Sequence, residues 1–410
     1  MLIGMDVHKN SVNVTEMEED GSVAENYEIE NSEVAWNGFT ERYSSTKPEI
    51  ALEQSTSGKY VARLLRDRGF SVHIADPAKM ALIFNSSKKN DREDSYKLAK
   101  LLRLGELPEV HLPSEYSDDL RSLVRYRKSL GEEVTVIKNR IHALLSSHGI
   151  RVDATDIIGR KGLREIEESS VKLKTKEGVV MGDMLERLSD LFDREREIEN
   201  NIALAVKDDG NVKLLMTIPG INVYSAAVIV SEIDDISRFK SKEKFASYSG
   251  LVPRQNQSGG RDIRGHISKR GPSMLRFVLV TASHTAIKRS KKLRSKYLSI
   301  VRRVGKNRAI VAIARILAEL IYSMLKNCTE FVDRVDSLTD RKMRAMSLRA
   351  KNAKAPDSVV QSVKLIRKGM LTKSSEHLFH RRKQLLIDSL AQGSKSILIV
   401  KEHCSVSTTF

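Results

Sequence analysis

The chain begins with Met1-Leu-Ile-Gly-Met-Asp6, an apolar run that ends on an acid, and a similar run is Glu49-Ile-Ala-Leu-Glu53. Short apolar runs of this kind predict buried strands. Between them lie Val12–Val14 and Val23–Ile29, which are separated by turn residues in a pattern typical of a β-hairpin. Predicted helices alternate with the later strands, so we expect a mixed α/β sheet domain over residues 1–110.

Four acids occupy positions from which they could form one site. Asp6 and Glu53 close the two apolar runs, while Asp91 and Asp94 lie three residues apart at the start of a predicted helix. Residues at that spacing share one helix face, and strand ends of one sheet can meet beside it. Carboxylate oxygens suit Mg²⁺, and a pair of such ions serves phosphoryl transfer. We therefore expect these four acids to be both metal ligands and catalytic residues.

An alternative is that these residues are ordinary surface acids among the 53 Asp and Glu residues of the chain. Glu93 and Asp76 compete with the two helix acids for the role of ligand. His8 is a further candidate ligand, although an exposed or phosphate-facing position is the simpler expectation for it.

Composition restricts the class of protein. The 410 residues carry a formal net charge of +17, which favours a nucleic-acid partner over mere solubility. The two cysteines, Cys328 and Cys404, are too few and too far apart for a disulfide framework or a zinc finger. No apolar run approaches the roughly 20 residues of a membrane span, and Asp6 interrupts any signal-peptide segment. We expect a cytoplasmic, nucleoid-associated protein without a membrane partner.

Residues 111–210 show the pattern of two long helices with narrow apolar seams. The three-four spacing of apolar residues is interrupted only by Arg127 in the first helix and by Glu195 in the second. This pattern predicts a coiled-coil hairpin or a dimerisation arm. The alternative is a pair of ordinary helices on a globular core. The polar stretch 146–180 fits no motif.

Residues 211–333 predict a compact, mostly helical block. It opens with Ile218-Pro-Gly-Ile-Asn222, which resembles a helix-hairpin-helix turn, with Pro219 and Gly220 as candidate nucleic-acid contacts through the backbone. Asn222 stands where a second glycine is usual, and asparagine tolerates the left-handed conformation. A plain structural turn is the alternative. The basic residues 334–410 read as a tail that adds a nucleic-acid contact.

A basic loop within this block, residues 253–271, contains a second group of candidate catalytic and phosphate-binding residues. Ser258 directly precedes Gly259 and Gly260, and paired glycines let a backbone approach a phosphate closely. A serine in that place could attack a phosphodiester while arginines stabilise the developing charge. The expected basic contacts to nucleic acid are Arg254, Arg261, Arg264, Lys269 and Arg270.

The serine assignment has competitors. The spacing alone favours a flexible basic loop with an incidental serine. Ser249 and Ser268 are rival nucleophiles, and His266 is the nearest candidate general base.

Taken in order, these motifs resemble those of the IS110 family of transposases, the mobile-element recombinases guided by a bridge RNA. The motifs that carry the resemblance are Gly4-Met-Asp-Val-His-Lys9, Glu53, Asn90-Asp-Arg-Glu-Asp94, Leu98-Ala99, Ile218-Pro-Gly220, Phe245 to Gly250, Leu251-Val-Pro-Arg254, Ser258-Gly-Gly260 and Ile267-Ser-Lys-Arg-Gly271. The resemblance covers residues 1–330.

The resemblance implies a specific architecture and chemistry. Residues 1–110 would form a RuvC-like (RNase H-like) catalytic domain, in which acids lie on the first strand, at the end of the fourth and on a late helix. These acids would be a DEDD tetrad that binds Mg²⁺, and Ser258 would be the nucleophile towards DNA. The partners would be double-stranded target and donor DNA, a guide (bridge) RNA, and further copies of the chain in a dimer or tetramer paired through the arm.

Two other functions remain open at this point. A RuvC-like nuclease would cut DNA junctions with metal-activated water, and Ser258 would only bind phosphate. A non-catalytic nucleic-acid-binding protein would show no metal-dependent strand cleavage.

We predict that Arg261→Ala weakens DNA affinity and flattens its salt dependence, because each lost phosphate contact reduces the number of counterions released on binding. Titrating DNA binding at several salt concentrations measures the slope. An unchanged slope would show that Arg261 does not contact phosphate.

Overall fold

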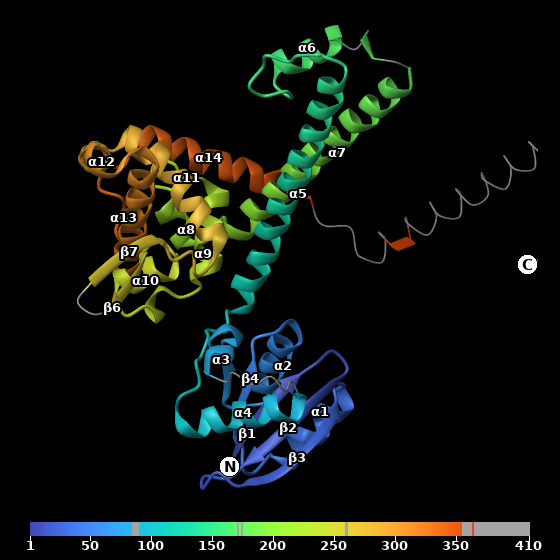
Figure 1. Ribbon diagram of the computed structural model, residues 1–410, viewed down its shortest axis with the longest axis vertical. Coiled ribbons are helices and arrows are strands. Elements are labelled where there is room, and N and C mark those ends of the chain that lie inside the picture. Colours follow the sequence, from blue (N-terminus) through green and yellow to red (C-terminus); the bar gives the residue numbers. More distant parts are fainter. Residues whose placement is uncertain (84–89, 170–171, 174, 259–260, 355–362, 365–410) are drawn as a thin grey trace, which may run out of the picture. The chain divides into compact units, whose positions relative to one another are not determined.

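The computed structural model describes residues 1–83, 90–169, 172–173, 175–258, 261–354 and 363–364, with the backbone alone at 175, 255–258 and 261–264 (Figure 1). Spatial contacts divide the chain into two units. The first comprises Met1–Ser122, Val228–Val280 and Lys306–Asn327, and the second comprises Leu123–Ala227, Thr281–Gly305 and Cys328–Phe410. The predicted combination of an N-terminal mixed α/β region with a mostly helical remainder is confirmed.

A five-stranded sheet forms the N-terminal part of the first unit. Its strands are β1 (Leu2–Val7), β2 (Ser11–Met17), β3 (Val23–Glu30), β4 (Glu49–Glu53) and β5 (Val72–Ala75), in the order β3-β2-β1-β4-β5. β1 to β3 form antiparallel pairs, whereas β4 is parallel to both β1 and β5. The predicted hairpin and both apolar strands are therefore present, and β1 lies at the centre.

The two faces of the sheet carry different helices. Alternate residues of β1, among them Ile3 and Met5, pack with α1 (Glu33–Arg42) and α2 (Thr56–Asp67) in one apolar core. The other face packs against α4 (Asp91–Leu104), which contributes Leu98 to a second cluster. Helix α3 (Pro77–Ile83) follows β5. Because side chains alternate along a strand, the even-numbered residues of β1 belong to the α4 face.

Gly4 sets how closely α4 approaches the central strand. A Cβ atom at Gly4 would lie 2.0 Å from the carbonyl oxygen of Ser95 and 2.5 Å from the backbone nitrogen of Ala99, both on α4. Any larger side chain would push the helix away from the sheet. A buried hydrogen bond of 2.8 Å between the hydroxyls of Ser95 and Thr15 fixes the helix against β2.

The rest of the first unit is a small helical assembly around a β-hairpin. It contains η2 (Ile236–Arg238), α10 (Lys242–Tyr248), β6 (Pro253–Ser258), β7 (Arg261–Ile267) and α13 (Lys306–Asn327). Helix α10 packs on α13, and the Tyr322 hydroxyl donates to the carbonyl of Phe239 at 3.1 Å. Residues 253–258 and 261–267, expected as part of a loop, form two antiparallel strands.

An antiparallel helical pair dominates the second unit. α5 (Glu115–Ser147) and α7 (Thr175–Val206) share one apolar core, and α6 (Arg160–Ser169) adds Ile166 to it. Two ion pairs show that the helices run in opposite directions. Arg127, in the first half of α5, pairs with Glu199 near the end of α7, and His148, just after α5, pairs with Glu177 near the start of α7. The two polar residues that interrupt the predicted seams meet each other, with Arg127 Nη1 at 3.6 Å from Glu195 Oε1.

Five further helices lie within the described residues. α8 (Gly210–Leu215), α9 (Val223–Ile233), α11 (Ser273–Arg289) and α12 (Lys291–Val304) belong to the part of the chain expected to be mostly helical, whereas no helix is expected where α14 (Asp336–Lys351) forms. α14 lies in the segment expected as a tail, and it packs along α7. In the ranges that the structure describes, no helix is both long enough and apolar enough to cross a membrane.

We predict that Gly4→Ala destabilises the protein by about 1–3 kcal/mol, the usual cost of overpacking a close contact. Gly38→Ala is the control, because Gly38 lies within α1 and a Cβ atom added there would meet no other atom within 4 Å. That change should be neutral or stabilising by up to about 1 kcal/mol, since alanine favours helix more than glycine. Thermal or urea unfolding measures both, and equal effects would contradict the role given to Gly4.

Candidate metal centre and nucleic-acid segments

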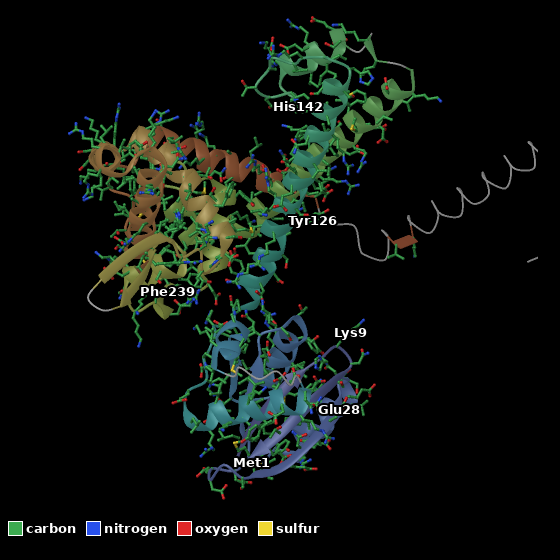
Figure 2. All side chains as sticks on the ribbon, in the orientation of Figure 1. Met1, Lys9, Glu28, Tyr126, His142 and Phe239 are labelled. Atoms are coloured by element: carbon green, nitrogen blue, oxygen red, sulfur yellow. The ribbon has the colours of Figure 1, made fainter. Side chains whose placement is uncertain are left out.

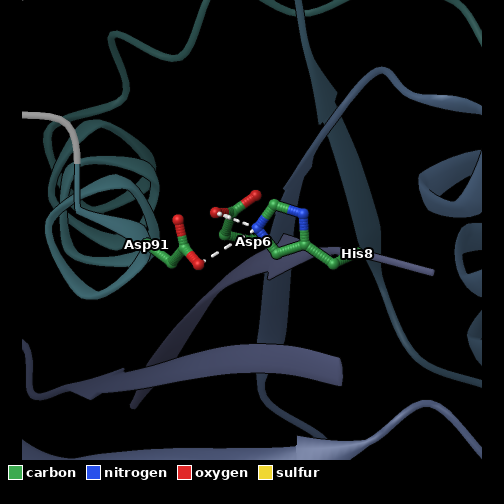
Figure 3. Close-up of side chains that lie close together, drawn as sticks. All are labelled: Asp6, His8 and Asp91. Atoms are coloured by element: carbon green, nitrogen blue, oxygen red, sulfur yellow. Dashed lines mark ion pairs between the residues drawn. The ribbon is translucent and has the colours of Figure 1, made fainter. Parts of the chain in front are cut away.

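Asp6, His8 and Asp91 come together at one edge of the sheet (Figure 3). The three residues each offer a ligand atom within 4.8 Å of the others. His8 Nε2 lies 3.2 Å from Asp6 Oδ2 and 3.3 Å from Asp91 Oδ2, so the imidazole bridges the two carboxylates. The Asp6 side chain is only 15% exposed, whereas those of His8 and Asp91 are about half exposed.

Local structure explains why these residues meet. Gly4, Asp6 and His8 alternate along and just beyond β1, so they belong to the face that α4 covers. Asp91 is the first residue of α4, and the Asn90 side chain caps that helix by accepting from the Arg92 N–H. Close packing at Gly4 therefore places the first turn of α4 beside Asp6.

Burial and charge both act on Asp6. Desolvation raises the pKa of Asp6 above its ordinary value, the attraction of His8 opposes that rise, and the carboxylates of Asp91 and Asp94 add to it. Asp94 itself pairs with Lys97 at 2.8 Å. A partly buried carboxyl surrounded by other acids holds its proton more tightly than usual.

Of the four predicted acids, the structure brings Asp6 and Asp91 into one cluster. Asp94 is near enough to influence Asp6 electrostatically but lies outside the cluster. Glu53 also lies outside it, although it follows Leu52, which pairs with Met5 directly before Asp6. The two acids at the strand ends therefore lie at the same edge of neighbouring parallel strands.

The donor set fits a divalent cation. Two carboxylates converge on a partly buried point, and a cation there would offset both the desolvation and the smaller repulsion that raise the pKa of Asp6. Carboxylate oxygens suit Mg²⁺, while an imidazole nitrogen suits a transition metal better. Asp6 and Asp91 are therefore the residues that would hold Mg²⁺, with His8 beside them.

His8 is the residue of this cluster that lies outside the predicted tetrad, although the sequence offers it as a further candidate ligand. Its spacing of two residues from Asp6 was the available signal, because that spacing puts both on one face of a strand. The Asn31 side-chain amide donates to the His8 carbonyl at 2.9 Å, and Asn31 in turn accepts from the indole of Trp36. These contacts hold the backbone from which the imidazole projects.

The structure also removes one of the competing acids. Asp76 accepts from the backbone N–H of Ala78 at 3.0 Å at the start of α3, which is a helix-capping role. Glu93 is exposed and lies outside the Asp6 cluster.

Ser258 ends strand β6, where it pairs with Arg261 of β7. Gly259 and Gly260, which separate the two, lie outside the described residues. Two polar runs divided by two glycines are a known signal for a tight hairpin, and this signal accounts for the strands that replace the expected loop. Arg264 pairs with Gln255 within the same hairpin.

The remaining predicted basic residues lie around the base of this hairpin. Arg254, Lys269 and Arg270 are all exposed. Arg276, which the sequence did not single out, donates to the carbonyls of Lys269 at 3.3 Å and Ser249 at 3.5 Å. Arg276 thus ties the segment after β7 to the end of α10.

The rival residues near Ser258 have distinct environments. Ser249 is fully buried and its hydroxyl donates to the carbonyl of Phe245 at 3.0 Å, which makes it a structural serine. Ser268 Oγ is buried and has no hydrogen-bond partner among the described residues. His266 is exposed and lines a cavity of about 440 Å³ with Asn307 and Arg308.

The turn at Pro219 and Gly220 has a defined structure. Gly220 has φ +99°, and a Cβ there would lie 2.6 Å from the carbonyl oxygen of Ala282, so glycine is required. Pro219 is buried. Asn222 does not adopt the expected left-handed conformation. It caps α9 instead, and its side chain accepts from the Ser225 N–H at 2.8 Å.

A lysine from α14 supports this turn. Lys342 Nζ donates to the carbonyls of Met216 at 2.6 Å and Ile218 at 2.7 Å, directly before Pro219. Burial lowers the pKa of Lys342 to about 8, with a smaller contribution from Arg341. The segment expected as a tail therefore reaches back to the predicted nucleic-acid turn.

Two family profiles match the regions that carry these sites. Residues 212–298 match the profile described as "Transposase IS116/IS110/IS902 family", and residues 3–150 match that of the IS110 DEDD transposases, described as "Transposase". Together they cover more than half of the chain. The chain belongs to the IS110 family of transposases. The predicted enzyme class, a DNA transposase, is thereby confirmed.

Relatives of this IS110-family member come from several bacteria. A "Probable family 20 transposase" of Pseudomonas aeruginosa is 26% identical over 68% of this chain and 84% of its own length. The "Transposase for insertion sequence element IS1111A" of Coxiella burnetii is 23% identical over 79% of this chain and 89% of its own. The "Transposase for insertion sequence element IS1328" of Yersinia enterocolitica is 27% identical over 70% and 84%.

We predict that Mg²⁺ raises the melting temperature of this transposase, because a ligand of the folded state alone stabilises it by about 2.7 kcal/mol at a hundredfold excess over Kd. Asp6→Asn should lose most of that shift. Glu93→Gln, which removes an exposed acid outside the cluster, should keep it. Thermal unfolding with and without Mg²⁺ measures the shifts, and equal shifts in both variants would contradict the metal assignment.

The shift in melting temperature that Mg²⁺ produces should depend on pH. In the metal-free protein a raised pKa means that folded Asp6 binds its proton more tightly than in the unfolded chain. Its contribution to the free energy of unfolding therefore falls as pH rises through the folded pKa. The shift produced by Mg²⁺ should grow over the same range, because the cation competes with that proton.

Proposed function

We propose that this transposase is an RNA-guided DNA recombinase that cleaves and exchanges strands through Ser258 and a carboxylate–Mg²⁺ site. Its substrates are double-stranded target and donor DNA, and a bridge RNA supplies the sequence recognition by base pairing. It acts on the nucleoid in the cytoplasm. The observation that carries this proposal is the convergence of Asp6 and Asp91 at one sheet edge, in a chain of the IS110 family.

The sheet supports a RuvC-like (RNase H-like) assignment of residues 1–110. Asp6 is on the first strand, Glu53 ends the fourth, and Asp91 and Asp94 are on a later helix, which is the order expected for such a domain. In this proposal Glu53 and Asp94 complete the tetrad when nucleic acid and cation are bound. Asp94 would then exchange its contact with Lys97 for one with the cation.

Each part of the chain has a chemical role in the proposed reaction. The Ser258 hydroxyl attacks a DNA phosphorus: a phosphoserine bond forms, the bond from that phosphorus to one strand's oxygen breaks, and that oxygen takes up the serine proton. A hydroxyl of the incoming strand later attacks the same phosphorus, and its proton returns to the released serine. When bound, Mg²⁺ would stabilise negative charge on the phosphate oxygens. Exposed Arg254, Lys269 and Arg270 would bind the DNA backbone around the hairpin, together with Arg261 and Arg264.

The paired helices α5 and α7 would serve as the coiled-coil arm between protomers, over residues 111–210. Their shared apolar core supports a rigid hairpin. Pairing of arms in a dimer or tetramer would let the acids of one protomer act with the serine of another. The block 211–333 would bind nucleic acid through its turn at Pro219 and Gly220 and through the serine hairpin, and residues 334–410 would add contacts.

The alternative function is a metal-dependent junction nuclease without a covalent intermediate. The Asp6 cluster would be sufficient for it, because metal-activated water needs no serine. The two functions differ in their products, since only the recombinase forms a bond between protein and DNA.

We predict that Ser258→Ala abolishes a covalent protein–DNA species that wild-type protein forms with labelled DNA and its guide RNA. Denaturing gel electrophoresis detects the species, because the bond survives unfolding. Ser268→Ala is the matched control, as it removes a neighbouring hydroxyl that has no described hydrogen-bond partner, and it should retain the species.

Asp6→Asn separates metal chemistry from binding in the same assay. It should lose both cleavage and the covalent species while DNA affinity stays close to wild type, because it removes a metal ligand and no phosphate contact. Cleaved DNA without any protein-linked product in wild type would favour the nuclease. Full recombination by Asp6→Asn would refute the acid assignment.

A further inference from the structure

A dense basic segment outside the sites above begins in the last turn of α11 and extends through α12. Residues 288–303 contain eight Lys and Arg residues and no Asp or Glu. They are Lys288, Arg289, Lys291, Lys292, Arg294, Lys296, Arg302 and Arg303. All eight are exposed, and Figure 2 shows nitrogen-tipped side chains around α12.

Helix α12 turns most of its apolar residues to one face, with Leu298 as an exposed exception. Leu293 is buried, and Tyr297, Ile300 and Val301 are half-buried, at the three-four spacing of one helix face. The opposite face carries basic residues with serines between them. We call this face the α12 surface, defined by Lys291, Lys292, Lys296, Arg302 and Arg303.

The charges of the α12 surface are not neutralised within the described parts of the chain. None of its five residues lies within 4.0 Å of a described carboxylate, in contrast to Arg315 and Arg334 farther along, which pair with Glu319 and Glu330. Asp333, which is distant in sequence, contacts the start of α12. It accepts from the Ser290 hydroxyl at 2.5 Å and from the Lys292 backbone N–H at 3.4 Å, so it caps the helix instead of pairing with the basic face.

We propose that the α12 surface binds the sugar-phosphate backbone of duplex DNA independently of base sequence. This inference rests on the proposed function in taking DNA as the substrate, but not on the serine chemistry. Five cations without a described carboxylate partner, held on a rigid helix, attract a polyanion, and duplex DNA presents a phosphate about every 3.4 Å along each strand. The span from Lys291 to Arg303 is about 18 Å at a rise of about 1.5 Å per residue, which matches several consecutive phosphates.

The side chains of this surface favour backbone contact over base reading. The face presents lysine, arginine, serine and the exposed Leu298. It lacks the asparagine or glutamine that reads adenine with paired hydrogen bonds, so only guanine could be read from it. The lysine ammonium is a point charge on a flexible side chain, and its contacts with phosphate carry little sequence preference. In this proposal the surface holds DNA in place through its phosphates.

The test measures binding of a short duplex of arbitrary DNA sequence by full-length protein at several salt concentrations. The test variant carries Lys292→Gln, Lys296→Gln and Arg303→Gln. We expect Kd to rise roughly tenfold or more and the slope of log K against log salt to fall by nearly 3, at about 0.9 per lost phosphate contact. A second variant, Arg302→Lys with Arg303→Lys, keeps the charge and should keep the slope.

The matched control removes three charges from the long helices instead. Arg140→Gln, Arg187→Gln and Arg194→Gln change exposed arginines on α5 and α7 that have no described ion pair, and they should leave the slope near wild type. An equal loss of DNA affinity in both triple variants would overturn the proposal. So would an α12 variant that loses affinity for duplex RNA of the same sequence but not for duplex DNA. Failure of the wild-type protein to bind duplex DNA would overturn the proposed function as well, whereas normal binding by the α12 variant would overturn this inference alone.

Discussion

The close approach of α4 to β1 at Gly4 is the constraint on which the candidate metal centre depends. The helix backbone lies so near that no Cβ fits between Gly4 and the Ser95 carbonyl. This contact fixes the distance from the first turn of α4 to the end of β1, and so brings Asp91 to Asp6. Two carboxylates this close repel each other, which contributes to the raised pKa of Asp6 after the larger effect of burial. The buried Thr15–Ser95 hydrogen bond and the imidazole of His8 act against that repulsion.

The sequence was most informative where periodicity is strong. The apolar runs ending at Asp6 and Glu53 are strands at the centre of the sheet, and the acid pair begins a helix, as the spacing predicted. Membership of the IS110 family followed from the order of motifs. His8 was open to the same reasoning, because it alternates with Asp6, but a lone histidine at a strand end carries little signal by itself.

Other features depend on contacts between distant segments, which a single sequence does not reveal. The polarity of residues 253–271 favours a loop, yet β6 and β7 within this range pair as antiparallel strands. The helix α14 was read as tail, since its stability comes from packing on α7 and from Lys342 reaching the carbonyls before Pro219. Arg127 interrupts the apolar spacing of α5 and Glu195 interrupts that of α7. The sequence does not show that these two residues form an ion pair with each other.

Anomalous diffraction from crystals soaked in Mn²⁺ shows directly whether Asp6 and Asp91 hold a divalent cation. Manganese replaces magnesium at oxygen-rich sites and scatters anomalously, so its position can be seen without any assumption about activity. We expect an anomalous peak between the carboxylates of Asp6 and Asp91. Density for Mn²⁺ only at other acids, with the Asp6 cluster empty at saturating concentration, would contradict it.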